Sequence, residues 1–293
     1  MSLLLSVLEQ GLIYAVLALG VYITFKILDF PDMSVDSSFP LGAAVTALMI
    51  QRGMHPLLTL PASLLAGAAV GAVTGIIHVR FKVRDLLAGI IVMTGLYSIN
   101  LHVAGRANVQ LFSCDTLFKN PGVSSLPAAV QPYVPVLVLA VIALAVKWLL
   151  DAYLATRSGF LLRATGDNAT LVATLAKDAG KVKILGLSIA NALVALSGCI
   201  MCQYQRYFDI SMGTGTLVLA VASVIMGTQL LSGLRFLRAT TAVVLGSILY
   251  KGCVALALSL GLSPFDLKLV TAVLLLVIII AGGQGRKKGA RHA

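Results

Sequence analysis

The sequence has very little charge, and this shortage decides its class. Only 11% of its 293 residues are charged, whereas 59% are hydrophobic, and the mean hydropathy is +0.98. A soluble domain carries about 25% charged residues, because water must solvate its surface. Long apolar runs recur from one end of the chain to the other. The composition therefore disfavours a soluble enzyme and predicts an all-α polytopic membrane protein.

Motifs for catalysis are also missing. The four histidines are scattered, and no HExxH, nucleophile elbow or paired-carboxylate spacing occurs. Cys199 and Cys202 form a lone CxxC inside an apolar run, which favours helix packing over a zinc or redox site. No G-x-x-x-x-G-K-[ST] occurs, so ATP would have to bind another chain. We expect no catalytic residue, metal or cofactor on this chain.

Nine apolar segments are long enough, or nearly so, to cross a membrane of about 30 Å. They cover residues 3–28, 38–51, 57–79, 86–104, 132–150, 184–205, 212–232, 239–260 and 267–283. The second segment is short, and the stretch before it is polar for its location. The whole chain, 1–293, is predicted to be a single transmembrane domain.

The net charge of +11 comes from short basic clusters between the apolar segments, a pattern typical of membrane topology and not of a nucleic-acid-binding face. If the connections alternate, most lysines and arginines lie on one side, including those at 80–84, 157–183, 235–238 and 286–291. The positive-inside rule then places the N-terminus outside the cell and the basic C-terminus in the cytoplasm. This tail could also attract anionic membrane lipid.

Two connections are long. The outer one, 105–131, contains Pro121, Gly122 and Pro127, and Pro132 follows it directly. It has no helical period, so we expect an ordered cap or loop. The inner one, 151–183, contains a short helix on the cytoplasmic side. Asp167 or Asn168 can cap its start, and Gly180 can end it.

This short helix is too polar to cross the membrane, and at 1.5 Å per residue it is only about 17 Å long. Leu171, Val172 and Leu175 lie on one face of it. A cytoplasmic helix with a narrow apolar stripe is typical of an element that binds a groove in another protein.

Small residues and a weak repeat suggest how the segments pack. Gly67, Gly71 and Gly75 lie four residues apart, on one helix face, where another helix can approach to backbone contact. We interpret them as a packing seam within one bundle, with a gating or dimer seam as the alternative. Residues 42–75 and 215–252 repeat the same order of segments, which would make an inverted repeat.

The strongest local anomaly is the polar stretch Asp29–Ser38 between two apolar segments. Non-helical polar backbone at membrane depth is tolerated only where protein buries it or a wet cavity adjoins it. The stretch is therefore either a broken helix near 29–40 that lines a solute path or an ordinary cytoplasmic loop. The candidate pathway residues are Asp32, Ser34, Asp36, Ser37 and Ser38.

Taken together, these motifs resemble the permease subunits of bacterial ABC importers, in the branched-chain amino acid and ribose-type family. The order of motifs carries the resemblance: GLIYAVLALG at 11–20, DMSVDS at 32–37, LGA at 41–43, and RSGFLLRATGDN at 157–168. The version DFPDMSVDSSFPLGAAV looks like a subgroup associated with aromatic amino acids, and Asp36 stands where sugar permeases often have glycine.

The resemblance implies a bacterial inner-membrane importer of a small solute, an amino acid or a related molecule. Its expected partners are a second permease copy, two ATPase subunits that bind ATP and Mg²⁺, and an extracytoplasmic solute-binding protein, with no nucleic acid. The 167–179 segment would be the coupling helix. The coupling residues would be Gly166, Asp167, Asn168, Leu171, Val172 and Leu175.

Two other functions stay open on the residues alone. A stand-alone secondary transporter of a small organic solute is one of them. Proton-driven carriers usually have carboxylates in mid-span, however, and Glu9, the only glutamate, lies near the outer end of the first segment, close to its first residue. The other is a membrane scaffold that transports nothing.

Overall fold

The computed structural model describes residues 2–120, 130–167, 178–231 and 237–259, together with 125, 127, 269, 271–273 and 276. The described chain is mainly helical. Its α-helices are α1 (Ser2–Val21), α2 (Val35–Gln51), α3 (Thr59–Arg80), α4 (Asp85–Ala104), α6 (Val134–Leu154), α7 (Arg157–Asp167), α9 (Ala179–Gln205), α10 (Thr216–Leu230) and α11 (Ala239–Ser259).

Shorter elements connect these helices. A π-helix, η1 (Tyr22–Ile27), continues α1, and the 3-10 turns are η2 (Pro56–Leu58), η3 (Gln131–Tyr133) and η4 (Ile210–Gly213). The strands β1 (Asn108–Gln110) and β2 (Tyr207–Asp209) pair antiparallel, with Val109 opposite Phe208. The outer connection 105–131 therefore begins with a strand that is held to the end of α9.

Seven helices in the described ranges are long and apolar enough to cross a membrane. They are Leu3–Ile27, Pro56–Arg80, Asp85–Ala104, Gln131–Leu154, Ala179–Gln205, Ile210–Gln229 and Ala239–Ser259. Each matches one predicted segment, so an all-helical polytopic membrane protein is confirmed. The predicted segment 38–51 is the 17-residue helix α2, and 267–283 lies mostly outside the described residues, so nine crossings stay a prediction.

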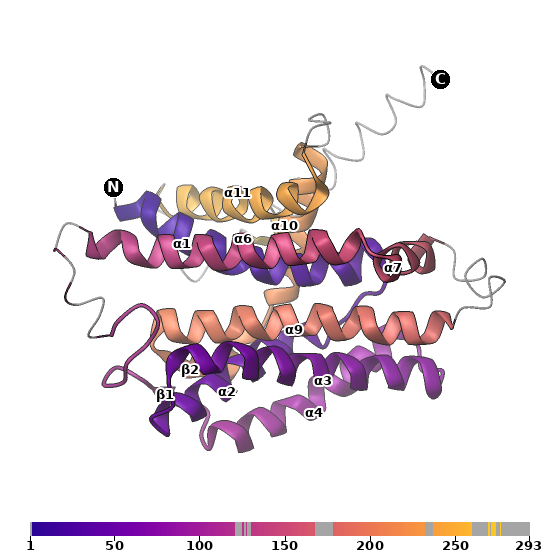
Figure 1. Ribbon diagram of the computed structural model, residues 1–293, viewed down its shortest axis with the longest axis horizontal. Coiled ribbons are helices and arrows are strands. Elements are labelled where there is room, and N and C mark those ends of the chain that lie inside the picture. The colour runs from indigo at the N-terminus through magenta and orange to yellow at the C-terminus, as the bar shows by residue number, and fades with distance from the viewer. Residues whose placement is uncertain are drawn as a thin grey trace.

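Helix α9 is the centre of the arrangement (Figure 1). It packs chiefly on α3 and α2, and also on α1, whereas α1 packs chiefly on α11. The two halves of the predicted repeat, 42–75 and 215–252, correspond to two pairs of contacting helices, α2 with α3 and α10 with α11. The strands β1 and β2 lie at the end of the molecule where α9 finishes, and α7 lies at the opposite end (Figure 1).

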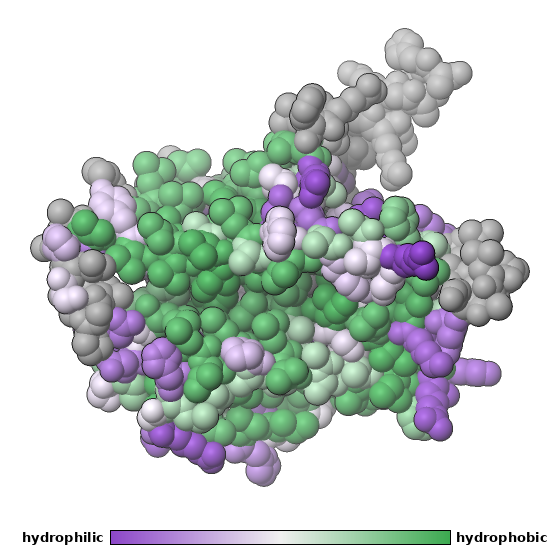
Figure 2. Space-filling view, viewed as in Figure 1, coloured by the Kyte–Doolittle hydropathy of each residue, from purple (hydrophilic) through white to green (hydrophobic). Residues whose placement is uncertain are grey.

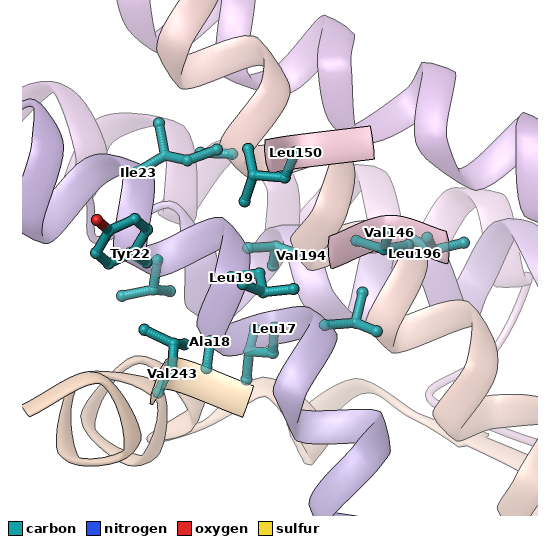
Figure 3. Packing of buried hydrophobic residues seen from close by; sticks show 14 of the residues in the cluster. Leu17, Ala18, Leu19, Tyr22, Ile23, Val146, Leu150, Val194, Leu196 and Val243 are labelled. Atoms are coloured by element: carbon teal, nitrogen blue, oxygen red, sulfur yellow. The ribbon is translucent and has the colours of Figure 1, made fainter. Parts of the chain in front are cut away.

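The main core forms where α1 meets α6, α9 and α11. Leu17 and Leu19 are fully buried, and Figure 3 shows them among Leu150, Val194 and Val243 from the three neighbouring helices. Two serines add hydrogen bonds between helices, from Ser197 Oγ on α9 to the Ile13 carbonyl (2.8 Å), and from Ser247 Oγ on α11 to the Gly11 carbonyl (2.8 Å). Helix α1 is thus fixed on two sides.

The outer surface fits a bilayer. A broad hydrophobic region covers the middle of the face in Figure 2, and most hydrophilic residues gather toward the two ends of the long axis. Large apolar side chains such as Leu137, Trp148 and Leu65 are more than half exposed. In water this surface would drive aggregation, whereas lipid solvates it.

The three predicted seam glycines lie against α9. An added Cβ would overlap the carbonyl oxygen of Asn191 at Gly67 and that of Leu187 at Gly71, and at Gly75 it would lie 2.8 Å from the Cα of Ile184. The contact residues descend along α9 as the glycines ascend along α3, so the two helices run antiparallel in backbone contact. This geometry places the seam inside one chain.

We predict that Gly71→Val lowers the melting temperature of the detergent-solubilised protein. The added side chain must push α3 from α9, and overpacking of this kind costs about 1–3 kcal/mol. The control is Gly95→Val on α4, because nothing lies within 4 Å of a Cβ there. Equal melting temperatures of the two variants would contradict the seam.

Candidate functional site

The polar stretch interrupts the helical backbone between η1 and α2. Asp29 has a φ of +50°, a left-handed conformation that aspartate tolerates better than most residues. Helix α2 begins at Val35, earlier than the predicted residue 38, and Pro40 lies inside it. The break in the helix is therefore confined to residues 28–34, shorter than the predicted 29–40. Helix α2 starts early because the Ser34 carbonyl already accepts the Ser38 N–H (2.8 Å), which is the first hydrogen bond of the helix.

Asp32 is the centre of a buried hydrogen-bond cluster. Its Oδ1 accepts from the backbone N–H (2.9 Å) and the hydroxyl (2.6 Å) of Ser34, and its Oδ2 accepts from Asn191 Nδ2 on α9 (2.8 Å). The Asn191 Oδ1 accepts from the hydroxyls of Ser38 (2.6 Å) and Ser34 (3.2 Å). All four side chains are at most 1% exposed. This cluster fastens the break to the central helix.

The amide of Asn191 must be oriented as described. The opposite orientation would point its oxygen at the Asp32 carboxylate and its NH₂ group at two hydroxyls, so two acceptors would face each other. In the orientation present, its Nδ2 also donates to the Leu187 carbonyl (3.2 Å). An asparagine side chain suits this position because its NH₂ group donates to a carboxylate while its carbonyl oxygen accepts from hydroxyls.

Asp36 performs a different task, at the start of α10. Its Oδ2 accepts the Gly215 N–H (3.0 Å), and its Oδ1 accepts the Leu217 N–H (2.8 Å) and the Thr216 hydroxyl (3.1 Å). A negative group at a helix N-terminus satisfies unpaired N–H groups and matches the helix dipole. Gly213 packs directly on the Asp36 carbonyl, where a Cβ would overlap the oxygen.

Ser37 binds a third helix. Its hydroxyl donates to the Met93 carbonyl on α4 (2.9 Å), and its own carbonyl accepts from Asn100 Nδ2 (3.0 Å). The five candidate residues are therefore adjacent in sequence but divided in space. Asp32, Ser34 and Ser38 face α9, Asp36 faces α10, and Ser37 faces α4. Asp36 is half-buried, whereas the other four are buried.

Sequence reasoning missed the two asparagines that complete these contacts. Asn191 and Asn100 are both fully buried, and each stands inside an apolar segment. A lone amide within such a run was the available signal, because an unpaired amide in lipid costs several kcal/mol and so needs a partner.

The coupling residues are described only in part. Gly166 packs on the Ile27 carbonyl of η1. Asp167 is the last residue of α7, which runs unbroken from Arg157, and the helix that Asp167 or Asn168 was predicted to cap lies outside the described residues. Asn168, Leu171, Val172 and Leu175 lie outside the described residues. Helix α7 itself was not predicted.

The end of the molecule near α7 is rich in cations. One cavity of ≈ 520 Å³ there is lined by His78, Lys82, Arg84 and Lys183, with Asp85 as its acidic residue. The side predicted to be cytoplasmic therefore corresponds to one physical end of the bundle.

Near the same end, a second cavity is lined by Arg163, Arg238 and Asp151, and the last accepts from Lys147 (3.2 Å) and Arg238 (3.3 Å). The Lys147 pair lies within α6, whereas the Arg238 pair joins the end of α6 to the residue before α11. Within the described ranges, no group of three His, Cys, Asp or Glu side chains could hold a metal ion.

Comparison with known proteins agrees with this membrane architecture. The family model described as "Branched-chain amino acid transport system / permease component" matches residues 3–281. This chain belongs to that permease family. The resemblance drawn from the motifs is therefore confirmed, and the permease is a component of a membrane transport system.

Individual relatives align along almost the whole permease. A tyrosine transport system permease protein of Clostridioides difficile is 44% identical over 282 residues, covering 96% of this chain and 92% of the relative. An uncharacterized protein of Rickettsia prowazekii is 32% identical, covering 94% and 96%. A ribose import permease protein of Escherichia coli is 26% identical, covering 96% and 85%.

We predict that Asn191→Ala lowers the free energy of unfolding by about 1.5–3 kcal/mol, the magnitude of a hydrogen bond to a charged group. The variant removes the hydrogen bond that Asn191 donates to the buried Asp32 carboxylate. Denaturation in mixed micelles measures the change. Ser188→Ala is the matched control, because that hydroxyl, one turn earlier on α9, donates within its own helix to the Ile184 carbonyl (2.8 Å). A loss no larger than the control's would refute the role of the cluster.

A second prediction concerns the cap on α10. Asp36→Ala removes all three acceptor contacts, so amide hydrogen exchange over residues 214–220 should become faster, as expected for a lost cap worth about 1 kcal/mol. Asp36→Asn keeps one carbonyl oxygen and should give an intermediate rate. Asp85→Ala, on the first turn of α4, should leave this peptide unchanged. If all three variants exchange alike, Asp36 does not hold the helix.

Proposed function

We propose that this permease is the membrane subunit of an ATP-driven importer for an aromatic amino acid such as tyrosine. The observation that carries the proposal is the 44% identity, along nearly the full length, to a tyrosine transport system permease. The ribose permeases are far less similar, at 26%. Asp36, which replaces the glycine common in sugar permeases, also supports an amino acid over a sugar.

Two copies of the permease would enclose the path between them, fed by an extracytoplasmic solute-binding protein. The N-terminus would lie outside the cell and the C-terminus in the cytoplasm. The cluster of cations near α7 supports this orientation, since basic residues accumulate on the cytoplasmic side.

ATP and Mg²⁺ would act on separate ATPase subunits, because the sequence lacks a phosphate-binding G-x-x-x-x-G-K motif. These subunits would receive the 167–179 segment as a coupling helix. Its base at Gly166 is packed on η1, so a force on this segment would be transmitted to the end of α1 and to the break beyond it.

Among the candidate pathway residues, Asp36 is the one we assign to the path. Asp32, Ser34 and Ser38 are buried and satisfied within the chain, so they hold the broken segment in shape. Asp36 is half-buried, and Thr214 and Gly215 beside it are exposed. A path bordered by one carboxylate and the start of a helix would be weakly polar. Such a path suits a solute that the solute-binding protein has already selected.

The test is uptake of radiolabelled tyrosine into proteoliposomes that contain the permease and its ATPase, with ATP inside and the binding protein outside. We expect uptake that needs ATP and stops when the phosphate-binding lysine of the ATPase is replaced. Ribose in excess should not compete. Uptake that needs no ATPase would show a secondary transporter instead, and the absence of any uptake would favour a scaffold.

One variant separates coupling from assembly of the membrane domain. Leu171→Pro should abolish co-purification of the ATPase and ATP-driven uptake, while the melting temperature of the permease stays the same. A variant that still binds its ATPase would contradict the assignment of the coupling helix.

A further inference from the structure

Lys251 is a cation in the middle of α11, a helix that is apolar enough to cross the membrane. Among the described residues, no acidic side chain forms an ion pair with it. Its ammonium lies over the ring of Tyr14 on α1, with Nζ 3.9 Å from the ring centroid. A charged residue at membrane depth is expensive to place, and its presence there indicates a function.

The ammonium does not reach toward the end of the bundle. A helical side chain leans toward the start of its helix, and Lys251 leans to the deeper Tyr14, which is 9% exposed and stacks on Phe39. Eight residues separate Lys251 from Ser259, the end of α11, which is about 12 Å along the axis. The charge therefore stays well below the level where phospholipid headgroups lie.

Lys251 also lines a cavity of ≈ 350 Å³ between α1 and α11. The cavity walls are mainly apolar, and in the described part of the chain its polar side chains are Ser6, Gln10, Lys251 and Ser259. It extends to Leu3, near the start of α1, so it reaches the end of the bundle that the proposed topology places outside the cell. We call these four polar residues and Tyr14 the Lys251 pocket.

The acidic residue of α1, Glu9, forms a hydrogen bond with α9 and not with Lys251. Glu9 is buried, and its Oε2 accepts the hydroxyl of Tyr204 on α9 (2.7 Å). Glu9 thus faces the opposite neighbour of α1, while Gln10 faces the pocket. Among the described residues, the cation in this cavity has an aromatic ring beside it but no anion.

We propose that the Lys251 pocket binds the carboxylate of the transported amino acid. This inference rests on the proposed function. An amino acid supplies a carboxylate for the Lys251 ammonium, which has no anionic partner among the described residues, and the apolar walls suit a side chain such as the phenol ring of tyrosine. Ser6 and Gln10 supply hydrogen-bonding groups. A sugar has no carboxylate, so Lys251 would also discriminate against sugars inside the membrane domain.

The first test measures binding of radiolabelled tyrosine to the purified permease–ATPase complex without the binding protein. Lys251→Met should weaken binding about tenfold or more, as the loss of a charged hydrogen bond predicts. Lys251→Arg should retain most of the affinity. Tyrosine methyl ester, which lacks the carboxylate charge, should compete poorly with radiolabelled tyrosine for the wild-type complex. This preference for tyrosine over its ester should vanish in Lys251→Met.

The proteoliposome assay keeps this inference separate from the proposed function. If the wild type imports tyrosine with ATP but Lys251→Met binds tyrosine as tightly, the pocket proposal is wrong and the importer stands. The melting temperature of Lys251→Met should not fall, because a charged side chain at membrane depth is costly to place and methionine carries no charge. If the effect of Lys251→Met occurs only in vesicles that contain phosphatidylglycerol, the anion is a lipid phosphate, and the proposal is also wrong.

Discussion

The structure depends on how a non-helical segment is satisfied inside an apolar bundle. Lipid offers no hydrogen bonds, so every polar group of the break must find a partner in the chain. Asn191 meets this requirement, because one amide donates to Asp32 and accepts from Ser34 and Ser38. Asp36 and Ser37 then extend the same segment to α10 and α4. A few hydrogen bonds thus set the positions of four helices.

This arrangement also limits where the protein can move. Helix α9 is in backbone contact with α3 at the glycine seam and is joined to the break by buried hydrogen bonds. Packed interfaces of this kind move as units and do not deform continuously. We therefore expect α2, α3, α4, α9 and the start of α10 to form one rigid body. Conformational change during transport would then occur between chains, or at the η1–α7 contact where Gly166 meets Ile27.

The sequence predicted features whose physics is local. Apolar length predicted the crossing helices, and the four-residue spacing of Gly67, Gly71 and Gly75 predicted a close helix contact. It could not identify the partner of that contact, because any helix fits a glycine face. Helix α7 was missed because Gly159 and Gly166 disfavour helix, whereas tertiary packing on Leu154 and Ile27 stabilises it. The division of the candidate residues among three helices was equally hidden, since adjacent side chains point in different directions.

The charges at membrane depth fall into two groups, and the difference follows from their partners. Asp32 and Asp36 each accept several hydrogen bonds, and Glu9 accepts one from Tyr204 on α9, so these three carboxylates help to stabilise the frame. Lys251 lies over the Tyr14 ring and forms no ion pair among the described residues. A solute binds best to a charged side chain that has few hydrogen bonds or ion pairs within the protein, because the new contact then displaces no existing one. The same argument leaves Asp36, half-buried with three acceptor contacts, as a residue that shapes the path more than it holds the solute.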